Sequence, residues 1–189
     1  DAAVTPEQER IPGYGGPKGN LGDEILAQCA TVEEALAYLE LKRVALHNSH
    51  MMFGDKSGKA VVVEWVAGER KLHWMAGNRL IMTNYLLSDT AAGNHPCYRH
   101  ASIERRLNDL ERSGEPIDLL GVGNTFGQAG QAPRAMEGER IGGTVYTSFI
   151  NITDMVFVLS YKMSNRNVVQ LDLKAEFAKG KRQKNVLKD

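Results

Sequence analysis

A side-chain amide at the end of an apolar segment is well placed to do chemistry in this sequence. Asn84 directly follows the apolar residues 80–83, which the pattern predicts to be a strand. An amide held rigidly at a strand end can donate hydrogen bonds to the negative charge that develops on an oxygen when an amide is cleaved. An asparagine in this position also commonly forms an ordinary turn. The residues alone leave both interpretations open.

Charged residues also occur in and after the predicted strands. Glu64 interrupts the apolar run 60–66, where an ionised carboxylate needs a partner or takes up a proton. We expect Glu64 to be structural and to anchor a backbone group or an arginine. Arg99, Arg105 and Arg106 follow on a predicted helix. That arginine face could support a site, or it could simply be solvated.

Histidine and cysteine do not form a metal or disulfide pattern. His47 and His50 would point to opposite faces of a strand, which is poor geometry for one ion. Cys29 and Cys97 are too few for a disulfide framework or a zinc cluster. We therefore expect no metal and no cofactor.

A cysteine and a histidine close in sequence offer an alternative chemistry. Cys97 and His100, with Asp89 and Asp109 nearby, have the residue types of a cysteine nucleophile with its base. Nothing in their spacing fixes a common geometry, so this alternative is the less favoured one.

The composition indicates one soluble globular domain or a large piece of one. The 189 residues are 42% hydrophobic and 24% charged, which is enough apolar material for a core. Lysine plus arginine equals aspartate plus glutamate, at 23 each, so no overall field favours nucleic acid. No run approaches the roughly 20 apolar residues of a membrane span. The compartment, cytoplasmic or periplasmic, stays undecided.

The first half of the chain predicts a loop, two helices and a sheet. Residues 1–22 are rich in glycine and proline and are expected to be loop. Two short helices should follow, joined at Thr31, because apolar residues recur at helical spacing and Thr31 forms a capping box with Glu34. An antiparallel meander is then predicted, with strands at 44–53, 60–66, 72–75 and 80–83. Its second strand should be buried on both faces, while Asp55 and Gly58 are expected only to form the turn before it.

The second half predicts a helix and a second set of strands. Apolar residues spaced by three and four predict an amphipathic helix at 98–112. The glycine-rich residues 121–143 lack periodicity and are expected to be a mobile connection. Three strands should follow at 144–150, 154–161 and 168–173, the last two joined by a turn at 164–167. We predict an α+β protein of antiparallel sheets packed with helices, in a single domain at 1–173 with a basic, solvated tail at 174–189.

The order of several short motifs resembles the linear-amide C–N hydrolases. This group includes choloylglycine hydrolase, penicillin V acylase and the isopenicillin N acyltransferase-like proteins, which are N-terminal-nucleophile enzymes of αββα fold. The resemblance extends from Leu21 to Leu173. It is carried by Leu26, Ala30–Ala35, Asn48, Phe53–Glu64, Thr83–Asn84, Ser102, Arg105, Thr144 and Tyr146–Ser148.

The resemblance implies a nucleophile that this sequence does not contain. In such families a cysteine freed at the start of the mature chain attacks the amide, its own α-amino group acts as the base, and an arginine and an aspartate follow it. Asp1 does not match, and Cys29 lies within a predicted helix. We therefore expect the chain to be the C-terminal part of an αββα sandwich, inactive without a companion segment that carries the nucleophile.

The resemblance also implies roles for individual residues. Asn84 would be the oxyanion or substrate donor, and Arg105 would give electrostatic support. Thr83 and Tyr85, the neighbours of Asn84, would contact the substrate. Glu64 and Arg106 would support the site. The substrate would be a small N-acyl amide of the bile-salt conjugate, penicillin V, acyl-homoserine lactone or acyl-peptide type.

Two other functions stay open. The same site could transfer the acyl group to an amine instead of water, which would make the protein an N-acyltransferase. A degenerate relative could instead keep the sheets and only bind a ligand or partner. Strands without their neighbours would leave open edges, so we also expect a homo-oligomer.

Overall fold

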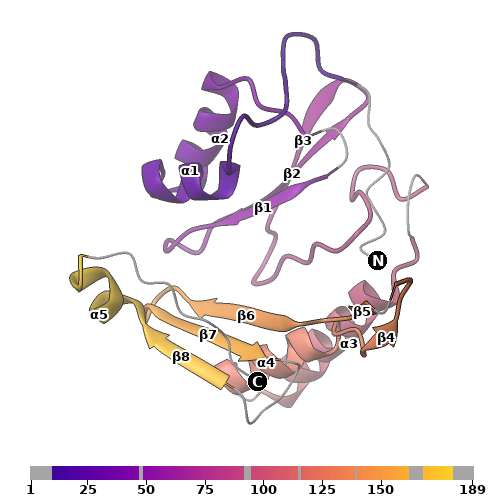
Figure 1. The fold of residues 1–189 in the computed structure, drawn as a ribbon, viewed down its shortest axis with the longest axis vertical. Coiled ribbons are helices and arrows are strands. Elements are labelled where there is room, and N and C mark those ends of the chain that lie inside the picture. Colours follow the sequence, from indigo (N-terminus) through magenta and orange to yellow (C-terminus); the bar gives the residue numbers. More distant parts are fainter. Residues whose placement is uncertain are drawn as a thin grey trace. The chain divides into compact units, whose positions relative to one another are not determined.

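A computed structural model describes residues 10–46, 49–91, 95–114, 116–138, 140–161 and 168–180. The chain divides into two compact units, residues 1–100 and 101–189 (Figure 1). Each unit combines helices with an antiparallel sheet, which confirms the predicted α+β class. The single-domain interpretation of residues 1–173 stays a prediction. In the described part of the chain, no helix is both long and apolar enough to cross a membrane.

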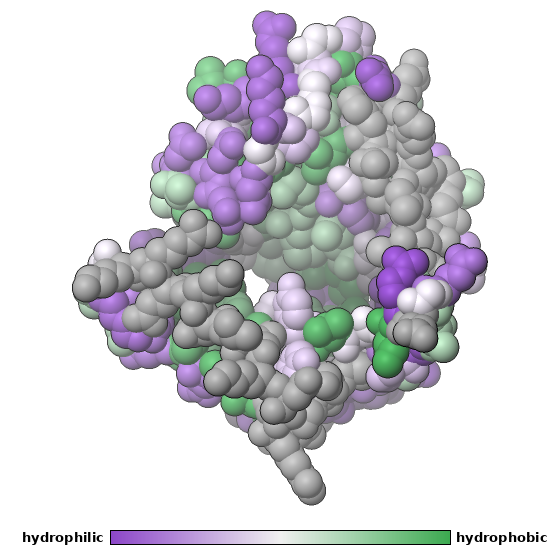
Figure 2. All heavy atoms as spheres, in the orientation of Figure 1, coloured by the Kyte–Doolittle hydropathy of each residue, from purple (hydrophilic) through white to green (hydrophobic). Residues whose placement is uncertain are grey.

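Two helices open the first unit, as predicted. Helix α1 spans Leu21–Gln28, and helix α2 spans Val32–Leu41. The Thr31 hydroxyl accepts the backbone N–H of Glu34, and the Glu34 side chain accepts that of Thr31. This capping box satisfies N–H groups that a helix start leaves without partners. Hydrophilic side chains gather over these helices on the face shown in Figure 2.

Three antiparallel strands form the sheet of the first unit. Strand β2 (Ala60–Val66) lies between β1 (Met51–Gly54) and β3 (Glu69–Trp74). The central residues of β2 are buried on both faces, as its continuous apolar run predicted. Val61, Val63 and Trp65 join the core with α1 and α2. Since side chains alternate along a strand, Glu64 projects from the opposite face.

The predicted fourth strand is not formed. Among the described residues between β3 and helix α3, Ala76 pairs with Arg79 in an isolated bridge and Tyr85 takes part in a further bridge. Residues 80–83 are therefore not a strand, although their apolar side chains suggested one. The first predicted strand is also shorter, because Val44 pairs with Gly15 in an isolated bridge and regular pairing begins only at β1.

Asp55 does more than form the predicted turn. Its Oδ1 accepts the backbone N–H of Ser57 at 2.8 Å, and its Oδ2 accepts that of Val32 at 2.9 Å. The Ser57 hydroxyl also donates to this carboxylate. That bond, followed by the bond from the Val32 backbone N–H, is the main cause that lowers the pKa of Asp55 to about 2. The β1–β2 turn, in which Gly58 has a φ of 88°, is thus tied to the start of α2. The expectation that Asp55 forms the turn only was wrong.

The second unit holds the other helices and strands. Helix α3 (Tyr98–Ser113) confirms the amphipathic prediction and begins just before the boundary between the units. A three-stranded antiparallel sheet follows in the order β6–β7–β8, close to the predicted ranges. Its strands are β6 (Tyr146–Asn151), β7 (Val156–Tyr161) and β8 (Val168–Asp172). The turn predicted at 164–167 lies outside the described residues.

The connection predicted as mobile contains regular structure. Helix α4 (Leu119–Gly127) begins where the Asp118 side chain accepts the N–H of Gly121 at 2.7 Å. Two short strands, β4 (Arg134–Ala135) and β5 (Ile141–Gly142), then form a hairpin. The sequence pattern did not predict α4, because its glycines weaken helix propensity.

The start of the predicted basic tail is also helical. Helix α5 (Leu173–Ala178) follows directly after β8. The Asp172 side chain accepts the N–H of Ala175 at 3.1 Å and caps the helix.

Candidate active site

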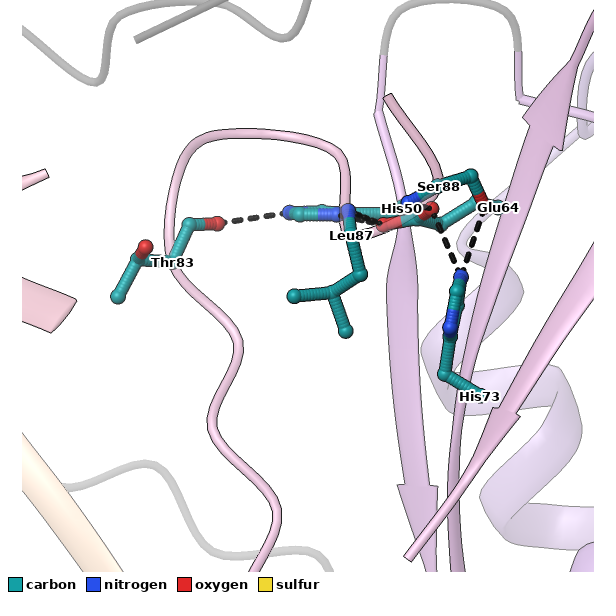
Figure 3. A network of polar contacts seen from close by, with 6 residues as sticks. All are labelled: His50, Glu64, His73, Thr83, Leu87 and Ser88. Atoms are coloured by element: carbon teal, nitrogen blue, oxygen red, sulfur yellow. Dashed lines mark hydrogen bonds and ion pairs between the residues drawn. The ribbon is translucent and has the colours of Figure 1, made fainter. Parts of the chain in front are cut away.

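Glu64 fixes the irregular segment that carries Asn84. Its carboxylate is fully buried on β2. Oε1 accepts the backbone N–H of Leu87 at 2.6 Å, and Oε2 accepts that of Ser88 at 2.8 Å (Figure 3). These bonds attach this irregular segment to the middle of the sheet.

Two histidines complete the surroundings of Glu64. His50 Nδ1 lies 3.3 Å from Oε1, and His73 Nε2 lies 3.2 Å from Oε2 (Figure 3). Burial raises the pKa of this carboxyl, but the hydrogen bonds from His50, Leu87 and Ser88 outweigh it and hold the pKa at about 2. Glu64 thus anchors backbone groups, and its described side-chain partners are His50, His73 and Ser88 rather than an arginine.

His50 also reaches the peptide bond before Asn84. Its Nε2 lies 2.7 Å from the backbone oxygen of Thr83. The His50 side chain is 6% exposed, so water competes little for this bond. His47, the other half of the considered metal pair, lies outside the described residues, in which no group of three or more histidine, cysteine or acidic side chains could hold a metal ion.

Asn84 is half-buried and contacts a cysteine. The Cys97 thiol donates to Asn84 Oδ1 at 3.0 Å. Since the carbonyl oxygen of the amide faces the sulfur, its N–H₂ group is directed to the other side of the side chain.

Cys97 lies in a polar environment at the start of α3. Burial by itself raises the pKa of this thiol, yet the backbone N–H of His100 and the Thr83 hydroxyl lower it. Arg99 lowers it further through its backbone N–H and its guanidinium, and the net result is a pKa below the ordinary value. Hydrogen-bond donors at a helix start are a known cause of thiol acidification.

The alternative of a cysteine paired with a histidine base gains no support from these contacts. His100 reaches the sulfur with its backbone, while its ring lies against Tyr85 at 5.4 Å. Asp109 pairs with Arg112.

The three candidate arginines differ in burial and in contacts. Arg99 is half-buried beside Cys97, and its Nε has no hydrogen-bond partner among the described residues. Arg105 is exposed and Arg106 is half-buried, and both lie on α3 in the second unit. The contacts described for Asn84 belong to the first unit, so the roles of Arg105 and Arg106 stay predictions.

The proposed substrate contacts differ in exposure. Thr83 is half-buried, with its hydroxyl close to the Cys97 sulfur. Tyr85 is 6% exposed and packs edge-on against His95, with ring centroids 5.0 Å apart. Substrate binding by Thr83 and Tyr85 stays a prediction.

Sequence reasoning missed the contribution of His50. A usable signal was the register of the β1–β2 hairpin, in which Met51 pairs with Val63. Extending that register by one pair puts His50 opposite Glu64. The sequence named Cys97 and Arg99 as candidates, but strand register could not show that Cys97 contacts Asn84 or that Arg99 contacts Cys97.

Comparisons with known proteins show the fold. No family model matches the sequence, and no curated protein matches it. A mutant conjugated bile acid hydrolase from Clostridium perfringens aligns with 92% of this chain and 67% of its own, at 16% identity and a TM-score of 0.61. Penicillin V acylase from Agrobacterium tumefaciens aligns with 91% of this chain and 69% of its own, at 16% identity and a TM-score of 0.58.

These similarities define a class of fold. The chain has the α+β fold of a conjugated bile acid hydrolase and a penicillin V acylase. It spans about two thirds of the length of each neighbour.

Proposed function

We propose that the protein is a linear-amide hydrolase in which Asn84 stabilises the oxyanion formed at the substrate carbonyl. The observation that carries this proposal is the way Asn84 is held. His50 binds the peptide oxygen just before it, and Cys97 binds its side-chain oxygen. A donor fixed in advance needs no reorganisation when negative charge develops.

The nucleophile in this proposal is an N-terminal cysteine on a companion segment outside the 189 residues. Its thiolate attacks the amide carbon, a C–S bond forms, and the carbonyl π electrons move to oxygen. The Asn84 N–H₂ group donates to that oxyanion. Collapse breaks the C–N bond, the amine leaves with a proton from the nucleophile's own ammonium group, and water then hydrolyses the thioester.

Arg99 takes the supporting role that the sequence suggested for Arg105. Its guanidinium lies beside Cys97, which contacts Asn84. A fixed positive charge there favours the developing negative charge of the intermediate. Glu64 contributes indirectly, since it holds the segment that carries Asn84.

Trapping of the acyl-enzyme tests the proposal. The full-length protein is incubated with conjugated bile salts, penicillin V, acyl-homoserine lactones and acylated dipeptides, and intact mass spectrometry detects a thioester. We expect one class to acylate the N-terminal cysteine. Release of the free acid means hydrolysis, whereas transfer to an added amine means that the protein is an acyltransferase. Acylation by none of them would refute the enzyme and favour a binding protein.

The companion segment and self-association belong to the same proposal. Strands β1 and β3 each have one outer edge without ladder pairing in the described part of the chain. Such edges accept a further strand from another segment or another copy. Sedimentation of the 189 residues should show a dimer that dissociates when the companion segment is added, and a monomer under both conditions would contradict this.

A further inference from the structure

We infer that His50 is a positioning residue that orients the Thr83–Asn84 peptide through a hydrogen bond from its ring, which the carboxylate of Glu64 holds from the other side. The inference rests on the proposed function of Asn84. It assigns to His50 a task that the pattern of the sequence did not indicate.

The contact with Thr83 shows that Nε2 of the His50 ring carries a proton. A backbone carbonyl oxygen only accepts hydrogen bonds, so His50 Nε2, at 2.7 Å, must donate. That oxygen belongs to the peptide whose nitrogen is that of Asn84. The bond therefore sets the plane from which the Asn84 side chain projects.

The contact with Glu64 holds the ring from its other side. His50 Nδ1 lies 3.3 Å from Glu64 Oε1, the oxygen that accepts the backbone N–H of Leu87 at 2.6 Å. The ring therefore lies between the buried carboxylate on β2 and the carbonyl group of Thr83.

The other titratable groups near this pair leave the assignment intact. His73 on β3 binds the second carboxylate oxygen and the Ser88 hydroxyl, which lies 2.7 Å from the same nitrogen. The Thr83 hydroxyl lies beside the Cys97 thiol, which Arg99 also contacts.

Both anchors of the Asn84 segment therefore converge on one carboxylate. His50 links Glu64 to the backbone just before Asn84, and Glu64 binds the backbone three and four residues after it. The described part of this segment forms isolated bridges but no strand. Removal of His50 frees the anchor at Thr83, and small displacements of a reacting group lower rates strongly.

Nuclear magnetic resonance of the full-length protein tests the inference without a substrate. We expect the wild-type ring of His50 to carry a proton on Nε2. His50→Leu should shift the Thr83 carbonyl ¹³C signal and the Asn84 side-chain N–H₂ signals, while His50→Gln, which keeps an N–H donor, should restore them in part. The matched control is His73→Leu, which removes a histidine from the same carboxylate and should leave the Thr83 and Asn84 signals in place.

Kinetics supply the second readout once a substrate is identified. His50→Leu should lower kcat by about 10- to 100-fold with KM changed by no more than about twofold, because positioning acts on the transition state. His50→Gln should recover most of that loss. Equal losses in His50→Leu and His73→Leu would overturn the positioning role.

Failure of the inference is separable from failure of the proposed function. A wild-type ring without a proton on Nε2, or unchanged Asn84 signals in His50→Leu, overturns the inference even if amides are hydrolysed. If His50→Leu does not fold, the wild-type spectrum and His50→Gln still decide. Absence of every amide substrate leaves this spectroscopic result standing.

Discussion

Glu64 and Leu87 are 23 residues apart, yet the carboxylate of one accepts the backbone N–H of the other at 2.6 Å. Glu64 is at the centre of β2, whereas Leu87 belongs to an irregular segment. The apolar core on one face of β2 holds the strand in place. The carboxylate on the other face therefore attaches the Asn84 segment to a fixed strand. A buried charge is retained here because backbone donors and histidines satisfy it.

Glu64→Gln should weaken the protein at neutral pH and change its response to acid. The pKa of Glu64 is about 2 in the folded protein against an ordinary 4.5. The folded state therefore binds fewer protons than the unfolded state between these values, so the stabilisation is present above pH 5 and disappears as the pH falls toward 2. Linkage puts it at about 3 kcal/mol at neutral pH. Urea unfolding at several pH values measures it.

A surface glutamate serves as the control for this experiment. Glu33 pairs with Lys59 and both side chains are more than half exposed. Because solvent screens such pairs, the Glu33→Gln variant should still lose folding stability as the pH falls below 5, as the wild type does. An unchanged pH dependence in Glu64→Gln would show that the carboxylate does not carry this effect.

Asn84→Ala should reduce turnover far more than a neighbouring asparagine substitution. Loss of one oxyanion donor costs about 10²- to 10³-fold in kcat. Asn78 lies in the same segment but is exposed in the turn between Ala76 and Arg79. Asn78→Ala should therefore stay close to wild type. Steady-state kinetics on the identified amide separate the two, and equal rates would remove Asn84 from the mechanism.

Arg99→Ala should raise the pKa of the Cys97 thiol. The guanidinium of Arg99 is one of the groups that lower this pKa, so the thiolate loses a donor when the side chain is removed. The ¹³Cβ chemical shift of Cys97 followed against pH measures the change. Arg105→Ala, on the exposed face of α3, should leave the titration where it is. A rise in both variants would point to a long-range field effect.

The sequence was sufficient where local signals determine the structure. The capping box at Thr31 predicted the start of α2, and the apolar run of β2 predicted a strand buried on both faces. It was insufficient where tertiary contacts decide. Residues 80–83 have the composition of a strand, but side-chain anchors rather than a neighbouring strand hold their segment. A period-two pattern contains no information about such anchors.

The same limit applies to the candidate site. Asn84 was singled out because a polar amide followed an apolar segment. The arginine beside it could not be selected, since Arg99 and Arg105 lie on the same helix and sequence spacing gives both the same weight. Only the folded backbone, which brings Cys97 against Asn84, distinguishes Arg99.

A pair of glycine substitutions in α4 should test how this helix packs in the second unit. A Cβ at Gly123 would lie 3.0 Å from the Phe149 ring on β6, closer than ordinary contact, while a Cβ at Gly127 would meet nothing within 4 Å. Gly123→Ala should therefore destabilise the unit by about 1–3 kcal/mol through overpacking. Gly127→Ala should be neutral or stabilising by up to about 1 kcal/mol, because alanine favours the helix. Thermal unfolding of the two variants gives the comparison. Equal stability would mean that α4 does not press on Phe149, and the stacking of Phe126 on that ring at 6.2 Å would then not fix the helix.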